Sequence, residues 1–264
     1  MSGVAHVRAV AMLAAPILFF TAQAHAADAT PLPPVDIESP AVVTLDDLGY
    51  QPLTQSGVSN VDLLKSLVRT NDTASLFSDA PGVTLYKAGG VSSLPVINGL
   101  NDDRVRVVID GMSIASTCPN HMNSPLSYID PTNVGTASVI AGLTPVSMGG
   151  DSIAGTINVN APAPIFGDSG AVTLQAAKIS SFYRSNGDGL SSSVSGTVAN
   201  DKVSLSYAGS AAQSDNYRGG GDDGEVRSSE YKSLNQSVTL AARAGQHLVV
   251  LKVGQQFTPY EGYP

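Results

Sequence analysis

Residues 104–112 read Arg-Val-Arg-Val-Val-Ile-Asp-Gly-Met, a mostly apolar run that ends in an Asp-Gly pair. Val105 to Ile109 is rich in β-branched residues, which favours a strand, and Asp110-Gly111 is a strong turn signal. Residues 149–159 read Gly-Gly-Asp-Ser-Ile-Ala-Gly-Thr-Ile-Asn-Val and end in a second apolar strand. We expect residues 58–165 to fold as a mixed α/β unit around these two strands.

Other local signals complete this unit. The sequence from Val61 to Val68 predicts a short helix with Asn60 as its N-cap. The turn signal at residues 79–82 precedes a predicted strand from Val83 to Tyr86. Pro162 is expected to close the unit.

The C-terminal part of the chain has the pattern of half-buried strands. Apolar residues alternate there with serine and threonine, and the predicted connectors are two short turns and one long polar loop. This pattern is typical of an outer-membrane barrel, whose tilted strands need about 9–11 residues, although a soluble β-sandwich alternates in the same way. The predicted strands are 171–183, 190–199, 202–212, 232–244 and 247–257, with turns at 200–201 and 245–246 and a loop over about 213–231. An aromatic girdle is expected from Tyr183, Tyr217, Tyr231, Phe257 and Tyr260.

The N-terminus predicts export. A weakly basic start, an apolar run from Ala9 to Phe20 and Ala24-His25-Ala26 together indicate a signal peptide over residues 1–26. Residues 27–57 form a Pro-rich polar leader without amphipathic periodicity, so we expect an extended segment.

Composition excludes several functions. The net charge of −8 argues against a nucleic-acid partner, and a single cysteine excludes an internal disulfide framework. Only His121 and His247 remain after signal removal, too few for most metal-hydrolase sites. No phosphate-binding loop of the G-x-x-x-x-G-K-[ST] type occurs. We therefore expect no enzymatic activity and no catalytic cofactor.

Sulfur is concentrated in one stretch, Cys118-Pro119-Asn120-His121-Met122. Beyond the signal peptide, the remaining methionines are Met112, Met122 and Met148, all close to Cys118 in sequence. Thiolate and thioether sulfur are soft ligands that favour Cu(I). A buried, inert cysteine is the structural alternative.

Residues 74–162 resemble the plug domain of TonB-dependent outer-membrane receptors. The resemblance rests on Ala80-Pro81-Gly82-Val83, on Leu94 to Leu100 and on the stretches 104–112 and 149–159, which match four plug motifs in order. Asn98 stands where an arginine is usual, and Ala141 to Pro145 also lacks the usual arginine. These two departures put the usual plug–barrel salt bridges in doubt.

The resemblance implies a transporter. A plug would fill a barrel of roughly 22 strands, and substrate would bind at its outer face. The leader would carry a TonB box that pairs with TonB by strand addition, with energy supplied by the inner-membrane proton gradient. The β-prone candidate for this box is Ala41-Val42-Val43-Thr44-Leu45.

Within that family, the sulfur-containing stretch resembles the Cys-x3-Met of copper-type receptors. This implies Cys118 and Met122 as ligands of a transported copper ion or copper chelate, with His121 as a weaker candidate. Pro119 suits a first helical position, and one helical turn would put Cys118 and Met122 on one side, with His121 beside that face. The alternatives are a siderophore or cobalamin receptor, in which Cys118 is incidental, and a secreted β-rich adhesin or binding module.

The predicted fold is therefore an α+β plug domain followed by the first strands of an antiparallel transmembrane β-barrel. Its parts are a signal peptide (1–26), a periplasmic leader (27–57), a plug (58–165) and about five barrel strands (166–264) in the outer membrane, in contact with its lipid. Because single-chain barrels start at roughly eight strands, we expect the chain to be the N-terminal part of a longer receptor.

Overall fold

The structure is a computed structural model that describes residues 55–264, apart from residues 88, 117, 119, 147–149, 151 and 222–223. The predicted signal peptide, most of the predicted leader and the candidate TonB box Ala41, Val42, Val43, Thr44 and Leu45 lie outside the described residues. No helix among the described residues is both long and apolar enough to cross a membrane.

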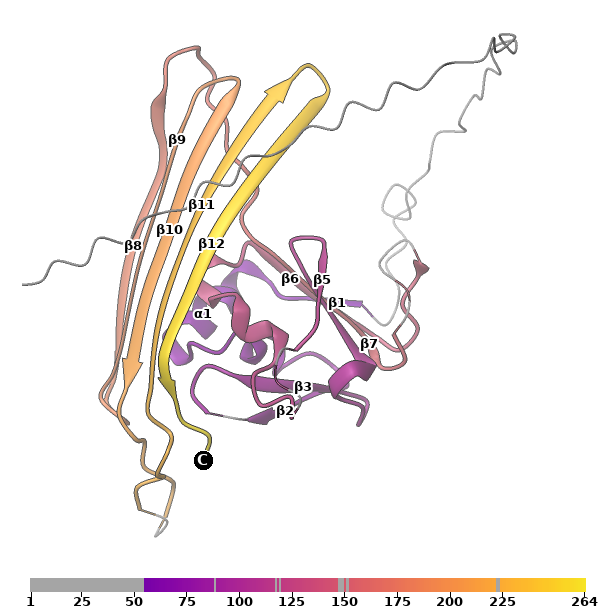
Figure 1. The fold of residues 1–264 in the computed structure, drawn as a ribbon, viewed down its shortest axis with the longest axis vertical. Helices are drawn as coiled ribbons and strands as arrows, with labels where there is room; N and C mark the ends of the chain where they lie inside the picture. The colour runs from indigo at the N-terminus through magenta and orange to yellow at the C-terminus, as the bar shows by residue number, and fades with distance from the viewer. Residues whose placement is uncertain are drawn as a thin grey trace, which may run out of the picture. The chain divides into compact units, whose positions relative to one another are not determined.

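The N-terminal domain, residues 55–165, is built on a five-stranded sheet (Figure 1). Its strand order is β1-β6-β7-β4-β5, in which β4 and β7 run parallel and the other neighbours run antiparallel. The bounds are β1 Gln55–Gly57, β4 Val105–Ile109, β5 Met112–Ile114, β6 Thr136–Ala141 and β7 Gly155–Asn160. The two strands predicted from residues 104–112 and 149–159 are thus hydrogen-bonded neighbours at the centre of this sheet.

Smaller elements surround the sheet. A hairpin pairs β2 with β3, and one α-helix and four short 3₁₀ helices complete the described part of the domain. Their bounds are β2 Val83–Lys87, β3 Ser93–Ile97, α1 Asn60–Arg69, and 3₁₀ helices at Thr73–Phe77, Asp102–Arg104, Pro125–Tyr128 and Pro131–Asn133.

Alternation along the central strands forms the core. Val105, Val107 and Ile109 are buried on β4, and Ile157 and Val159 are buried beside them on β7. They pack in one cluster that also contains Phe77, Leu126 and Val139. Burying side chains of this size stabilises a domain by about 1.5–3 kcal/mol each.

The N-cap of helix α1 lies one residue earlier in the chain than the sequence predicts. Ser59, and not the predicted Asn60, is the N-cap, because its Oγ accepts a hydrogen bond from the Asp62 amide at 3.2 Å. The Ser59 hydroxyl also donates to the Asp62 carboxylate at 2.6 Å. Serine and asparagine are equally good caps, so sequence preference alone did not separate these neighbours.

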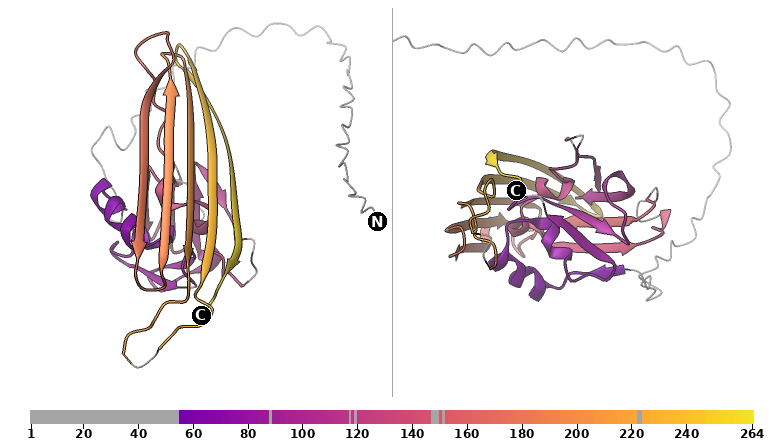
Figure 2. Two further views of the ribbon diagram at one scale, coloured as in Figure 1. Left: turned by 90° about the vertical axis from the view of Figure 1, so that its left-hand side faces the viewer. Right: turned by 90° about the horizontal axis from the view of Figure 1, so that it is seen from below.

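The second sheet, which we call the wall, contains the five predicted C-terminal strands in the order β12-β11-β10-β9-β8, all antiparallel (Figures 1 and 2). Its strands are β8 Thr173–Arg184, β9 Gly189–Ala199, β10 Val203–Ser214, β11 Tyr231–Ala244 and β12 His247–Glu261. The sheet is unclosed, as expected for the first strands of a barrel. Strand β12 is longer than the predicted strand over residues 247–257, because it continues through a bulge to Glu261.

The wall has a polar face towards the N-terminal domain and an apolar face away from it. On β11, Ser233 is buried and Asn235 and Ser237 contact the N-terminal domain, whereas Leu234 and Val238 are exposed on the other face. The short turns follow β9 and β11, and the longer loop over residues 215–230 lies at the opposite rim, as the connector lengths predicted. Tyr231 is not part of an outward girdle, since its side chain is 5% exposed and faces inward.

Candidate functional site

The loop that carries Cys118, His121 and Met122 lies between β5 and the 3₁₀ helix at Pro125–Tyr128. The Ser116 hydroxyl accepts from the Cys118 amide at 3.3 Å and donates to the carbonyls of Cys118 and Asn123 at 3.1 and 3.0 Å. The Ser92 hydroxyl donates to the Met122 carbonyl at 3.0 Å and accepts from the Ser124 amide at 3.1 Å. Serine hydroxyls therefore fix the loop internally and to the β2–β3 hairpin.

The predicted helical turn over this loop is wrong. The His121 amide donates to the Cys118 carbonyl at 2.9 Å, which closes a turn, and His121 has φ 53°, in the left-handed region. A residue in that region cannot continue a right-handed helix. Cys118 and Met122 therefore share a compact turn rather than one side of a helix.

Backbone amides of the turn surround the Cys118 sulfur. The amide of Asn120 and then that of Met122 contribute most, with smaller contributions from Asn123 and His121, and their hydrogen bonds lower the pKa of the Cys118 thiol. Donors that point at the sulfur favour the thiolate, which is the form that binds metal. Cys118 is a free, partly buried cysteine, and the Met122 side chain is 43% exposed.

The first prediction follows from this lowered pKa. The pH dependence of Cys118 alkylation should have its midpoint below that of the same thiol in the urea-unfolded chain, because only the folded turn orients its amides towards the sulfur. The measurement is the rate of modification by iodoacetamide across pH, read by mass spectrometry of the peptide that contains Cys118. Equal midpoints for folded and unfolded protein would contradict the amide arrangement.

His121 points towards neighbouring carboxylates. Its Nδ1 lies 3.9 Å from Asp102 Oδ1 and its Nε2 lies 3.9 Å from Asp103 Oδ2. In the described part of the chain, no three side chains of His, Cys, Asp or Glu gather where they could hold a metal ion. The loop thus brings two sulfur-containing residues together and directs its histidine elsewhere. Of the other methionines, Met112 is exposed on β5, whereas Met148 lies outside the described residues.

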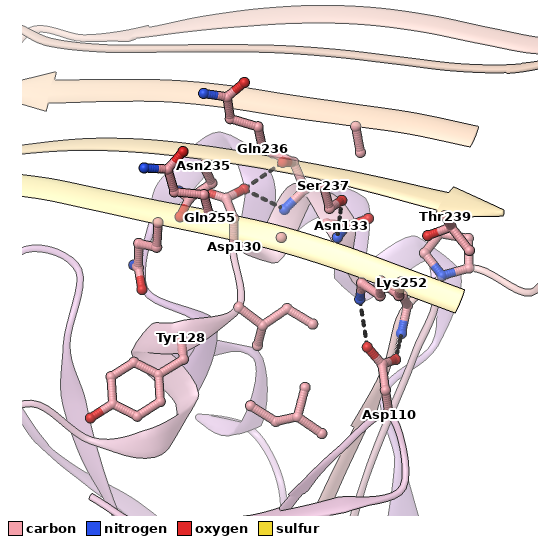
Figure 3. Close-up of a pocket in the computed structure, with 18 of the residues that line it drawn as sticks. Asp110, Tyr128, Asp130, Asn133, Asn235, Gln236, Ser237, Thr239, Lys252 and Gln255 are labelled. Carbon is pink, nitrogen blue, oxygen red and sulfur yellow. Dashed lines mark hydrogen bonds and ion pairs between the residues drawn. The ribbon is translucent and has the colours of Figure 1, made fainter. Parts of the chain in front are cut away.

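Polar contacts join the N-terminal domain to the wall. Near the loop rim, the Arg184 guanidinium donates to the Asn71 side-chain oxygen and, at 2.8 Å, to the Tyr231 hydroxyl, which itself donates to Asn71 at 3.0 Å. Nearer the turn rim, Lys252 Nζ on β12 lies 2.5 Å from Asp110 Oδ2 (Figure 3). The second Asp110 oxygen accepts from the Ala161 amide at 2.7 Å.

Between these contacts lies an open cavity of about 760 Å³. Figure 3 shows that it is lined from both sides, by the N-terminal domain and by the wall. Asn235 donates to Asp130 at 3.1 Å, and Asn133 donates to Ser237 at 3.2 Å, so amide and hydroxyl groups bridge it. Its lining from the N-terminal domain includes Ile109, Asp110, Met112, Tyr128, Asp130 and Asn133, and its lining from the wall includes Asn235, Ser237, Thr239, Lys252 and Gln256.

Sequence reasoning missed these contacts between the domain and the wall. The sequence predicts Asp110 only as part of a turn, and its partner Lys252 is 142 residues away. Asn71 and Tyr231 are 160 residues apart. The one available signal was polarity, because Lys252 and Asn235 lie on the polar face of alternating strands.

Residues 50–156 match the family model described as the TonB-dependent Receptor Plug Domain. No curated protein sequence matches the chain significantly. Among solved structures, the chain is similar to the "Copper transporter OprC", with 25% identity and a TM-score of 0.67 over 80% of this chain and 31% of that one.

Two further structures share the fold. The FrpB iron transporter from Neisseria meningitidis (F3-3 variant) is 18% identical, with a TM-score of 0.65 over 78% of this chain and 32% of that one. The Serratia marcescens hemophore receptor HasR, a double mutant in complex with HasA and heme, is 17% identical, with a TM-score of 0.66 over 79% of this chain and 32% of that one. The chain thus spans about a third of the length of these three proteins.

The chain therefore contains a TonB-dependent receptor plug domain followed by the strands of an unclosed barrel-type sheet. TonB-dependent receptors are transporters and not enzymes, in agreement with the expectation from the sequence.

Proposed function

We propose that this chain is the plug-bearing part of an outer-membrane receptor that imports copper with energy delivered by TonB. In this proposal residues 1–26 are the signal peptide, 27–57 the periplasmic leader, 58–165 the plug and 166–264 the first strands of the barrel. The last three residues of the leader, Gln55–Gly57, form β1 and pair with the plug strand β6. Copper, as the ion or a chelate, is the transported substrate and not a resident cofactor.

The observation that carries the proposal is the turn that holds Cys118 and Met122. It combines a thiol with a lowered pKa and an exposed thioether in one short loop. Thiolate and thioether ligands together select Cu(I), because zinc sites rarely use methionine. The similarity to the copper transporter OprC supports the same substrate. The iron and heme proteins support the fold alone.

His121 has a lesser role in this proposal. Its ring faces Asp102 and Asp103 at 3.9 Å, so it would have to turn away from these carboxylates to bind copper. Two sulfur ligands leave the copper shell incomplete, and the remaining ligands would come from other parts of the receptor.

The energy-coupling partner is TonB together with its proton-gradient-coupled inner-membrane complex. The candidate TonB box, Ala41 to Leu45, precedes β1, which is an edge strand of the plug sheet. An extended leader can add as a strand to TonB, a mode in which backbone hydrogen bonds carry the affinity.

The second prediction tests the substrate. On intact cells that express the full-length receptor, Cu(I) should protect Cys118 from maleimide, because a metal-bound thiolate no longer attacks the reagent. Zn(II) and ferric siderophore at equal concentration are the controls and should leave labelling unchanged. Labelling that is insensitive to Cu(I) would favour a siderophore or cobalamin receptor, in which Cys118 is incidental.

The third prediction tests the direction of the wall. If the leader is periplasmic, the short turns lie on the periplasmic side of the outer membrane and the loop over residues 215–230 lies on its external side. An epitope inserted at Gly220 should therefore bind antibody on intact cells, whereas one inserted at Asn200 should bind only after the outer membrane is opened. The opposite pattern of labelling would refute the direction.

A further inference from the structure

The tip of the β2–β3 hairpin, residues 89–92, packs tightly against the wall (Figure 1). A Cβ atom placed on Gly90 would lie 2.3 Å from two carbon atoms of the Tyr231 ring. Val91, which is 7% exposed, packs in one cluster with Ala212 and Tyr231. The hairpin tip therefore contacts β10 and β11 and leaves no space for a methyl group at residue 90.

The wall residues that meet the tip are themselves fixed. The Tyr231 side chain is buried, and its hydroxyl donates to Asn71 at 3.0 Å and accepts from Arg184 at 2.8 Å. The tip also meets the chain just after β12, because a Cβ atom placed on Gly89 would lie 2.3 Å from the Gly262 carbonyl oxygen. Two places on the wall thus determine where the hairpin tip lies.

The residues that follow this contact hold the loop that carries Met122. Ser92 and Ser93 are both fully buried. The Ser92 hydroxyl donates to the Met122 carbonyl at 3.0 Å and accepts from the Ser124 amide at 3.1 Å. The Ser124 hydroxyl donates to the Ser93 carbonyl at 2.8 Å. Three hydrogen bonds therefore join the loop to residues that directly follow the wall contact.

The two sulfur-containing residues are held in different ways. The Cys118 amide donates to the Ser116 hydroxyl, which donates back to the Cys118 carbonyl, so these bonds stay within the loop. The Met122 carbonyl is instead held from the hairpin. A binding site needs each ligand within about 0.5 Å of its working position. The contacts from the wall thus bear more directly on Met122 than on Cys118.

We propose that the hairpin tip is a positioning element through which the wall sets the place of the Met122 ligand. Tyr231 and Gly90 act at one end of this element and Ser92 acts at the other, and none of the three binds copper. The inference rests on the proposed copper function, because these residues act through Met122. Outer-shell partners that hold a ligand change metal affinity by roughly 10–100-fold. We expect the lower end of that range, since Ser92 holds the backbone of Met122 and not its sulfur.

The test compares the Cu(I) affinity of variants of the full-length receptor, measured by competition with a chromogenic Cu(I) chelator. Gly90→Ala should lower the affinity about tenfold, because its methyl group must push the tip away from the buried Tyr231 ring. Ser92→Ala removes both hydrogen bonds of that hydroxyl and should have a similar effect. Gly57→Ala is the matched control on β1, where nothing lies within 4 Å of an added Cβ atom, and it should leave the affinity unchanged.

The same variants in a Met122→Ala background separate positioning from a general loss of stability. There, Gly90→Ala and Ser92→Ala should cause no further loss of affinity, because their effect passes through Met122. Losses that add to the Met122→Ala loss would overturn the inference. Wild-type Cu(I) affinity in both hairpin variants would also overturn it. Heat-modifiable migration on a gel identifies the variants whose barrel is folded.

Hydrogen exchange without copper gives an independent measurement. The peptide that contains the Ser124 amide should exchange several-fold faster in Gly90→Ala than in wild type, and Gly57→Ala should match wild type. Equal exchange in Gly90→Ala and wild type would overturn the inference whatever metal is bound. A wild-type receptor that binds no Cu(I), together with faster exchange in Gly90→Ala, would refute the copper proposal alone, and the coupling of wall to loop would stand.

Discussion

Replacement of Cys118 by alanine is expected to remove most of the copper bound by the full-length receptor. The thiolate is the charged ligand of the pair, and hydrogen bonds from the backbone amides of the turn lower the pKa of Cys118 and so favour this form. Loss of a direct ligand should exceed the roughly 10–100-fold loss of metal affinity that follows removal of an outer-shell partner. Metal analysis of the purified receptor after copper loading is the measurement.

Matched variants separate ligand loss from loop damage. Cys118→Ser keeps the size of the side chain but lacks a soft donor, so it should also lose copper. Met122→Ala should weaken binding, and His121→Ala should matter less because its ring faces Asp102 and Asp103. None of these variants should change zinc or iron uptake. Unchanged copper in Cys118→Ala would refute the assignment and leave a generic receptor.

Replacement of Asp110 by alanine is expected to give the largest loss of stability at the contact between plug and wall. Its carboxylate accepts from the Ala161 amide at 2.7 Å and from Lys252 at 2.5 Å, and alanine would leave both donors without it. Breaking a buried ion pair costs about 3–5 kcal/mol, and partial exposure of both side chains lowers this to about 1–3 kcal/mol. Unfolding in urea measures the effect on the full-length receptor.

The control variants separate the loss of stability caused by breaking the ion pair from the loss caused by backbone strain at residue 110. Asp110 has φ 50°, which asparagine tolerates and alanine does not, so Asp110→Asn removes the charge without adding that strain. It should cost less than Asp110→Ala but more than Lys65→Ala. The Lys65 variant breaks an exposed pair with Asp62, at 3.3 Å, which water screens and which therefore contributes little to stability. An Asp110→Asn variant as stable as the Lys65 control would show that the pair does not hold the plug to the wall.

Local patterns predicted most of the fold. The wall strands follow from alternation over 10 or more residues, and strand β4 follows from a β-branched run ended by Asp-Gly, which are signals carried by neighbouring residues. The errors are also local. Ser59 and Asn60 are equivalent caps by preference, and a proline after Cys118 suggested a helix where His121 instead adopts φ 53°.

The candidate site could be predicted only in part. Cys118 and Met122 are close in sequence, so their proximity needed no knowledge of the fold. The Ser92 hydroxyl that holds Met122 comes from 30 residues away, and Lys252 reaches Asp110 from 142 residues away. Such pairs depend on how the sheets pack, which periodicity does not encode.

X-ray absorption at the copper edge of the copper-loaded full-length receptor tests the central claim most directly. We expect a shell with two sulfur neighbours of Cu(I), and Met122→Leu should remove one of them while preserving the volume of the side chain. A copper shell that contains only nitrogen and oxygen neighbours in the wild-type receptor would contradict the account.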